Sequence, residues 1–416
     1  MAVTNTHIYV YADWKGLAGP TLVGTLYAQA AKGKKAFSFE YHKQWLQSKH
    51  QYVLDPDISF YSGPQYPGNK ENFGIFLDSM PDTWGRTLMK RNAAALAREQ
   101  GKKPRVLYDI DFLLGVYDET RMGALRFKTN PGGPFLDDNA DTPVPPLSSV
   151  RELQYAAEQF ESDKNDEDIR QWLNILVAPG SSLGGARPKA NVLDENRQLW
   201  IAKFPSKNDT VDKGAWEFLA YELARKAGIE MAPCRIAMIR KKHHTFFTKR
   251  FDRQRSERIH FASAMTMTGN TENTIRDNPA SYLDIADFIQ TYGARVNENL
   301  HQLWRRIVFN IAISNTDDHL RNHGFLLTGG GWVLAPAYDL NPSTDKSGLA
   351  LNINMEDNAL DFELAKSAGE FFRLAPAQMD KIIREVTGSV KQWQKLADKI
   401  GINRKEQDLL HAAFRV

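Results

Sequence analysis

Three residues in the second half of the chain have the types and spacing that a phosphoryl-transfer site requires. Asp317 and Asn322 lie five residues apart, and Asp339 follows Asn322 after seventeen residues. In protein kinases, a catalytic-loop Asp accepts the substrate hydroxyl's proton, an Asn five residues later binds magnesium, and a later Asp binds the metal that bridges the phosphates. The order and the first spacing match, so kinase-type phosphoryl transfer is the first hypothesis.

The flanking sequence predicts how these three side chains are positioned. Residues 300–314 have apolar positions at helical spacing, and this helix would deliver Asp317 to a loop on a rigid support. A hairpin of residues 324–327 and 332–335 would fold Asp339 back toward that loop. Taken singly, Asp317 could be a helix cap, Asn322 a turn residue and Asp339 a surface carboxylate. Asn322 and Asp339 offer the hard oxygen atoms that Mg²⁺ prefers.

A glycine-rich segment and a lysine lie upstream of Asp317, Asn322 and Asp339, which we call the acidic set although one member is an asparagine. Gly180, Gly184 and Gly185 could expose backbone N–H groups to phosphate oxygens, although a tight turn would also require glycines. Lys203 ends an apolar strand and is well placed to hold phosphates. Glu217, at the start of the next helix, could pair with Lys203; a plain surface ion pair is the alternative.

Two histidines and a second aspartate surround Asn322. His319 and His323 are four residues apart, a spacing that binds zinc on one helix face. Because they straddle a predicted loop, hydrogen bonds that order the loop are the favoured interpretation. Asp318 is expected to face water or to cap the loop.

The pattern along the chain predicts three parts and a linker. Residues 1–130 are mixed strand and helix, and 131–147 are rich in Pro, Gly and Asp and form the expected linker. Residues 148–255 have the element order of a kinase small lobe, and 256–416 are mostly helical. Predicted elements are strands at 7–12, 24–27, 35–41, 199–204, 235–239 and 245–251, and helices at 82–98, 150–160, 167–177, 216–227, 282–292, 300–314, 363–371, 377–387 and 390–400.

Composition excludes several classes of protein. Of the 416 residues, 42% are hydrophobic and 25% charged, as in ordinary globular proteins, and no apolar run is long enough to span a membrane. Cys234 is the only cysteine, so no intramolecular disulfide can form. A net charge of +3 is too small to indicate nucleic-acid binding by itself. With no secretory signal visible, a cytoplasmic location is expected.

The chain resembles the HipA family of bacterial Ser/Thr kinases, the toxins of type II toxin–antitoxin pairs. The resemblance extends over almost the whole sequence. Its motifs are Asp78-Ser79-Met80-Pro81-Asp82, Gly123-Ala124-Leu125-Arg126-Phe127, Ser182-Leu183-Gly184-Gly185-Ala186-Arg187-Pro188-Lys189, Lys249-Arg250-Phe251-Asp252-Arg253, Asn315-Thr316-Asp317-Asp318-His319-Leu320-Arg321-Asn322-His323 and Ala337-Tyr338-Asp339-Leu340 with Pro342.

The resemblance implies an α+β, two-lobed protein-kinase-like fold with a mixed α/β N-terminal part and a mainly helical C-terminal lobe. It implies ATP and Mg²⁺ as cofactors, with Asp317 as catalytic base and with Asn322 and Asp339 on the metal. Ser182, or its neighbour Ser181, would be the autophosphorylated serine. The implied nucleotide-binding residues are Gly184, Gly185, Ala186, Arg187, Pro188, Lys189, Lys203, Lys249, Arg250, Phe251, His319, Asn322 and Tyr338.

The resemblance also implies partners. A HipB-like antitoxin is expected, with DNA contacted only through it because the chain shows no helix-turn-helix, and an aminoacyl-tRNA synthetase is one possible protein substrate. Lys249 stands where a Glu is common in the family, so adenine contacts there would use the backbone. The main alternative is a catalytically idle module that joins an antitoxin on DNA. A metal-dependent phosphohydrolase is a third hypothesis, although a second set of metal ligands is lacking.

Overall fold

The computed structural model describes residues 4–31, 34–68, 70–136, 144–162, 169–180, 182, 185–240 and 242–416. The chain divides into two compact units, one formed by Met1–Asn208 with Asp252–Ala262 and the other by Asp209–Phe251 with Ser263–Val416. The chain therefore passes between the units at residues 208/209, 251/252 and 262/263. The three-part division expected from the sequence stays a prediction, and residues 137–143 of its linker lie outside the described residues.

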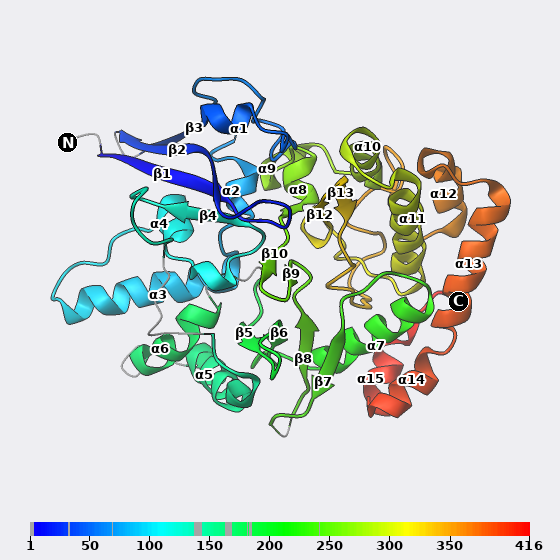
Figure 1. The fold of residues 1–416 in the computed structure, drawn as a ribbon. Helices are drawn as coiled ribbons and strands as arrows, with labels where there is room; N and C mark the ends of the chain where they lie inside the picture. Colours follow the sequence, from blue (N-terminus) through cyan, green and yellow to red (C-terminus); the bar gives the residue numbers. More distant parts are fainter. Residues whose placement is uncertain are drawn as a thin grey trace. The chain divides into compact units, whose positions relative to one another are not determined.

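The first unit is built on a four-stranded antiparallel sheet with the strand order β3-β2-β1-β4 (Figure 1). Alternate residues of β1, namely Ile8, Val10 and Ala12, are buried, as the period of two in the sequence predicts. Val10 faces Phe127 across the pair with β4. The strands of this unit are β1 (Thr4–Ala12), β2 (Thr21–Ala31), β3 (Lys34–Tyr41), β4 (Leu125–Lys128), β5 (Lys189–Leu193), β6 (Leu199–Lys203), β9 (Arg253–Gln254) and β10 (Glu257–Arg258).

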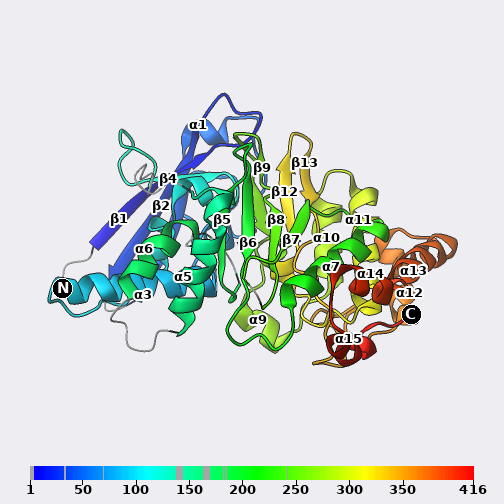
Figure 2. The same ribbon diagram turned by 90° about the horizontal axis from the view of Figure 1, so that it is seen from below.

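Helices accompany this sheet and the β5–β6 hairpin. Helix α6 packs against both α3 and α5, which lie beside it in Figure 2. Asp82 caps α3 by accepting a hydrogen bond from the Thr83 N–H, which confirms the predicted helix start. The helices of this unit are α1 (Lys43–Leu46), α2 (Gly74–Leu77), α3 (Thr83–Glu99), α4 (Asp109–Leu114), η1 (Asp118–Thr120), η2 (Leu147–Ser149), α5 (Val150–Ser162) and α6 (Ile169–Gly180).

Two sequence motifs that lie far apart in the chain interlock inside the first unit. Gly123 has a left-handed φ of 73°, and its N–H donates to the Asp252 carboxylate over 2.8 Å. Arg253 donates to the Gly123 carbonyl oxygen over 3.1 Å. A Cβ atom on Gly123 would lie 3.0 Å from the Phe261 nitrogen and 3.2 Å from the His260 ring. A side chain at Gly123 would be strained and crowded, so glycine suits this contact with residues 252–262.

The second unit is organised around the long helix α11, whose residues Trp304, Ile307, Val308 and Ile311 are fully buried. It packs against α10, α12 and α13. The strands of this unit are β7 (Cys234–Ala237), β8 (Thr245–Lys249), β12 (Gly324–Thr328) and β13 (Gly331–Leu334), and β11 (Phe261–Ser263) spans the division. Its helices are α7 (Lys213–Lys226), α8 (Ala264–Met267), α9 (Glu272–Asp277), α10 (Tyr282–Tyr292), α11 (Val296–Ala312), η3 (Leu320–Asn322), α12 (Phe362–Ser367), η4 (Gly369–Phe372), α13 (Pro376–Val390), α14 (Trp393–Ile400), α15 (Arg404–Leu410) and η5 (His411–Ala413).

The predicted hairpin that follows the loop of Asp317 and Asn322 is confirmed. Strands β12 and β13 pair in antiparallel register, with Thr328 opposite Gly331. The turn residue Gly331 has a φ of 118°, which residues with a side chain rarely adopt. No helix within the described residues is long and apolar enough to cross a membrane.

Candidate active site

The loop that holds Asp317 begins directly after α11 and is fixed at its first residues. Ser314 has a left-handed φ of 47° and turns the chain out of the helix. Asn315 then bonds back to Asn310 twice, with its N–H 2.8 Å from the carbonyl oxygen and its side-chain amide 3.0 Å from the side-chain oxygen. Asp317 follows with a side chain that is 80% exposed, 4.0 Å from the Lys346 ammonium. The carboxylate is therefore accessible on a firmly anchored backbone.

Asn322 lies at the other end of the same loop. It ends η3, is 8% exposed, and its side-chain NH₂ donates to the Asp317 carbonyl oxygen over 3.1 Å. This bond orients the amide and leaves the amide oxygen as its group for binding a cation. The structure thus brings Asp317 and Asn322 together, as their spacing predicts.

The segment that contains Asp339 is hydrogen-bonded along the same loop. The Tyr338 hydroxyl donates to the Arg321 carbonyl oxygen over 2.8 Å, and the Ser343 N–H donates to the Ser314 carbonyl oxygen over 3.2 Å. Asp339 itself is exposed and has a left-handed φ of 59°. Non-glycine residues in this conformation are strained and cluster at functional sites. All three acidic-set residues therefore belong to one cluster of loops.

The donor set at this cluster fits Mg²⁺ better than zinc. Within the described ranges no group of three or more His, Cys, Asp and Glu side chains could hold a metal ion. Asn322 and Asp339 instead supply one amide oxygen and one carboxylate, and Mg²⁺ in phosphate sites takes one or two such ligands and keeps waters and phosphate oxygens for the rest. His319 stands at the N-cap position of η3 without a side-chain capping bond, and His323 bonds to Asp318. The favoured loop-ordering interpretation is thus confirmed for His323.

Asp318 does not face water, so the first of its two expected roles is wrong. Its side chain is 1% exposed, and one carboxylate oxygen accepts hydrogen bonds from the Tyr282 hydroxyl (2.5 Å), the His323 ring (2.7 Å) and the Asn310 amide (2.8 Å). Burial by itself would raise the pKa of Asp318, but the neighbouring His323 and the bonds from His323 and Tyr282 hold it below its ordinary value. Burial, with Asp318 beside it, raises the pKa of Tyr282 well above its ordinary value, so the proton stays on Tyr282.

In the first unit, Gly185 at the end of the glycine-rich segment is held at the start of α3. The Gly185 N–H lies 3.3 Å from the Asp82 carboxylate, and the Trp84 N–H donates to the Gly185 carbonyl oxygen over 2.9 Å. Gly185 has a φ of 74°. Ala186, Arg187 and Pro188 continue from it into β5. Leu183 and Gly184 lie outside the described residues, so the role expected for Gly184 stays a prediction.

The hairpin β5–β6 places two lysines directly opposite each other. Lys189 and Lys203 are register partners, and Lys189 is only 9% exposed. Lysine ammonium groups are point charges that nucleotide sites commonly use to hold phosphate oxygens. Glu217 lies half-buried on α7 of the second unit, and its pairing with Lys203 stays a prediction.

Ser182 is described and buried. It is 5% exposed, and its hydroxyl oxygen accepts a hydrogen bond from the Asn191 amide over 3.0 Å. A hydroxyl in this position cannot meet a nucleotide unless the segment moves. The rival Ser181 lies outside the described residues.

The residues expected near adenine lie at the end of β8, where the chain leaves the second unit. Lys249 is the last residue of β8, Arg250 is 3% exposed, and the division between the units follows Phe251. The Phe251 ring lies 5.6 Å from the ring of Tyr338, which is hydrogen-bonded to the Asp317 loop. Two of the predicted nucleotide-binding residues are therefore in contact.

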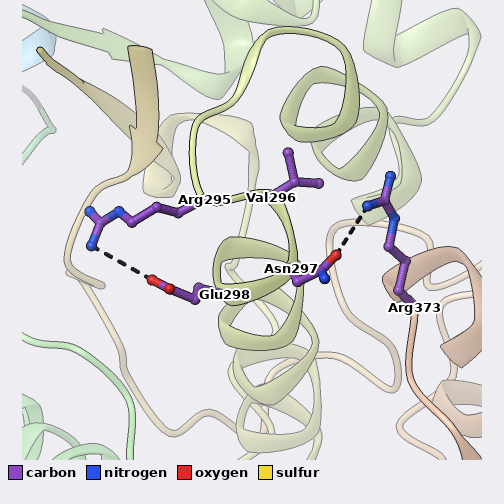
Figure 3. Close-up of a pocket in the computed structure, with 5 residues that line it drawn as sticks. All are labelled: Arg295, Val296, Asn297, Glu298 and Arg373. Atoms are coloured by element: carbon purple, nitrogen blue, oxygen red, sulfur yellow. Dashed lines mark hydrogen bonds and ion pairs between the residues drawn. The ribbon is translucent and has the colours of Figure 1, made fainter. Parts of the chain in front are cut away.

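A hollow of about 330 Å³ in the second unit is unrelated to these residues. It lies at the start of α11 and is lined by Arg295, Val296, Asn297, Glu298 and Arg373 (Figure 3). Asp317 follows the opposite end of this helix, roughly 25 Å away along seventeen residues at 1.5 Å each. Both arginines are already bonded, Arg295 to Glu298 at 3.7 Å and Arg373 to Asn297 at 3.0 Å.

Sequence reasoning missed two anchors near the end of the chain. Glu406 on α15 accepts hydrogen bonds from the Asp212 N–H and the Trp216 ring, both at 3.0 Å, and so fixes the start of α7. The Arg415 guanidinium donates to the Ser314 hydroxyl over 3.0 Å, at the turn that leads into the Asp317 loop. Both are contacts between residues about a hundred or more positions apart, for which the sequence contains no local signal.

The sequence matches the family model described as the HipA-like C-terminal domain over residues 181–394, which is more than half of the chain and includes the whole Asp317 loop. The chain belongs to the HipA family. HipA of Shewanella oneidensis MR-1, solved with HipB and its operator DNA, has a similar fold with a TM-score of 0.65 and 17% sequence identity, covering 98% of this chain and 94% of that one. This likeness confirms the predicted fold class.

A second solved structure is only distantly similar. The proinflammatory kinase CtkA of Helicobacter pylori gives a TM-score of 0.34 and 12% identity, over 51% of this HipA-family chain and 94% of that one. No curated protein matches the chain in a sequence comparison.

Proposed function

We propose that this HipA-family chain is a Mg²⁺- and ATP-dependent protein kinase that transfers a phosphoryl group to a Ser or Thr hydroxyl. One observation supports this most strongly: an accessible Asp317 carboxylate shares an anchored loop with Asn322, and the segment that contains Asp339 is hydrogen-bonded to that loop. This is the order and clustering that phosphoryl transfer by protein kinases uses.

In this proposal each residue of the cluster has a separate role. Asp317 accepts the proton of the attacking hydroxyl and orients it, since it is the exposed carboxylate of the loop. The Asn322 amide oxygen and the Asp339 carboxylate hold Mg²⁺, which when bound neutralises charge on the phosphates. The hydrogen bond between the Asn322 amide and the Asp317 carbonyl oxygen keeps base and metal ligand at a fixed separation.

The residues of the first unit bind the phosphates in this proposal. Lys189 and Lys203 face each other across the β5–β6 pair, and in this proposal their ammonium groups contact phosphate oxygens. Gly185 has a left-handed φ that residues with a side chain rarely adopt, and in this proposal its backbone approaches the phosphates. Lys249, Arg250 and Phe251 would line the adenine, with Tyr338 beside Phe251.

Regulation and partners follow from the family. Ser182 would be the autophosphorylated serine, and a phosphate there would place about two negative charges next to Asn191 of β5, which would disfavour the phosphates of a nucleotide. A HipB-like antitoxin would bind this chain, as HipB does in the Shewanella complex. The chain would contact DNA only through this antitoxin. The chain itself would act as a growth-arresting toxin. The phosphoryl group would go to a Ser or Thr hydroxyl of a protein substrate. An aminoacyl-tRNA synthetase is the kind of target that the resemblance suggests.

One experiment separates this proposal from its alternatives. The full chain is incubated with Mg²⁺ and ATP labelled on the γ-phosphate, and the label is then located. A kinase leaves the label on a Ser or Thr side chain of the chain or of an added protein. Free labelled phosphate alone would indicate a phosphohydrolase, and unchanged ATP would indicate an idle binding module.

A further inference from the structure

A buried polar cluster lies beneath the Asp317 loop. It consists of Asp318, His323, Tyr282 and Asn310, which are from 0 to 2% exposed, and we call it the Asp318 cluster. The three other side chains all donate to the same oxygen of Asp318. The Tyr282 and His323 rings also meet edge to face, with centroids 5.7 Å apart.

The members of the cluster come from three separate elements. Tyr282 is the first residue of α10, Asn310 lies in the last turns of α11, and His323 leads from η3 into β12. The Asp318 carboxylate is therefore the point at which two helices and a strand are tied to the loop. The loop cannot shift without breaking hydrogen bonds to at least one of these elements.

The cluster residues alternate with the residues of the proposed site. Asp317 points outward and its neighbour Asp318 inward; Asn322 bonds to the Asp317 backbone, and its neighbour His323 bonds to Asp318. The two pairs have the same spacing of five residues. We propose that the Asp318 cluster consists of positioning residues that hold Asp317 and Asn322 in their working geometry; this rests on the proposed kinase function.

The cluster also extends toward Asp339. The Asn310 side-chain oxygen accepts a hydrogen bond from the Asn315 amide over 3.0 Å. The Asn315 side-chain oxygen in turn lies 3.4 Å from the Asn341 N–H, two residues after Asp339. One chain of side-chain bonds thus connects the buried carboxylate with the segments of all three acidic-set residues.

Stability alone does not account for such a cluster. Burying an ionised carboxylate is costly, and apolar side chains of similar volume are often equally stabilising in its place. What apolar side chains cannot supply is direction, because hydrogen bonds fix orientation as well as distance. Ligand-orienting partners of this kind typically change metal affinity or activity by about 10- to 100-fold when removed.

Four variants test the proposal. His323→Leu removes a donor to Asp318 while keeping an apolar side chain in the core, and His323→Gln returns a side-chain NH₂ near the position of the ring nitrogen. Tyr282→Phe removes the second donor with little change in volume. The matched control is Ser389→Ala, which also deletes a buried hydrogen bond, 2.8 Å to the Leu223 carbonyl oxygen, but on α13 away from the loop.

The first measurement is the Mg²⁺ dependence of phosphoryl transfer by the full chain, at a temperature where every variant is folded. His323→Leu should lower kcat by about 10- to 100-fold and raise the half-saturating Mg²⁺ concentration by about tenfold. Tyr282→Phe should show the same pattern more weakly, and His323→Gln should recover most of the loss. Ser389→Ala should lower the melting temperature without changing either constant.

The second measurement is hydrogen exchange of residues 314–323, which needs no activity. His323→Leu should speed exchange of these amides by about tenfold or more and leave residues 296–310 of α11 unchanged. If exchange and both constants match Ser389→Ala, the cluster is only a structural element and the proposal is wrong. If the wild type transfers no phosphate but exchange responds as expected, the proposed kinase function fails while the positioning of the loop stands.

Discussion

His260 provides a quantitative test of how deeply the first unit buries a titratable group. Its ring is 1% exposed and stacks on Trp14 with the centroids 5.2 Å apart and the planes 12° apart. Burial lowers the pKa of His260 from 6.5 to about 3. In the unfolded chain the ring has its ordinary pKa, so between these two values the unfolded state binds a proton that the folded state does not. The free energy of unfolding must therefore fall as the pH drops below 6.5.

The size of the effect follows from the two pKa values. At about pH 5 the unfolded ring is mostly protonated and the folded ring is neutral, which costs about 2 kcal/mol relative to about pH 7.5. The loss continues to grow until the pH reaches the folded pKa. His260→Phe keeps an aromatic ring against Trp14 and removes the titration. Between these two pH values the variant should thus lose about 2 kcal/mol less than the wild type.

The assay is urea unfolding of both proteins at the two pH values, followed by far-UV circular dichroism. Taking the difference between proteins cancels every other group that titrates equally in both. His7→Phe is the matched control, because it makes the same substitution at an exposed position on β1 of the same unit. A difference for His260→Phe below about 0.5 kcal/mol would refute the reasoning that burial keeps this ring neutral.

Two further predictions concern the glycine-rich segment. Gly185→Ala should raise the half-saturating ATP concentration about fivefold or more. The reason is that a φ of 74° costs a residue with a side chain roughly 1 kcal/mol, and the added Cβ would lie 2.7 Å from the Lys189 ammonium. Initial-rate kinetics measure this concentration, with Gly388→Ala on α13 as the control, and equal values for the two variants would contradict the argument. Ser182→Ala should remove most self-labelling by ATP. Asn191→Ala should increase the rate of self-labelling by up to about fivefold, because it removes the hydrogen bond of about 1 kcal/mol that holds the Ser182 hydroxyl. Phosphopeptide mapping follows both variants, and label on another residue would exclude Ser182.

Elements with local signals could be predicted from the sequence. The helix that begins near Asp82, the strand at residues 7–12 and the hairpin around Gly329–Gly331 depend on neighbouring residues, and the structure confirms them. The clustering of Asp317, Asn322 and the Asp339 segment also follows from short spacings. The return of residues 252–262 to the first unit could not be predicted in this way, because it depends on contacts of Gly123 with residues more than a hundred positions away.

The burial of Asp318 shows where reading a loop from its sequence fails. Asp317 and Asp318 are identical neighbours, and a loop has no period that assigns one of them to the interior. Only the donors on α10 and α11 decide it. One signal was available: Asp318 and His323 repeat, one residue later, the spacing of Asp317 and Asn322.

The most direct test of the central claim is the rate of phosphoryl transfer by Asp317→Asn. This variant keeps the size of an exposed side chain and removes only its ability to accept a proton. The control is Asp408→Asn, another exposed aspartate of the second unit, which pairs with Arg404 on α15. If Asp317 is the base, single-turnover transfer from labelled ATP should fall by about 10²- to 10⁴-fold in Asp317→Asn and stay unchanged in Asp408→Asn. Equal rates in the two variants would contradict the assignment of this loop as the catalytic site.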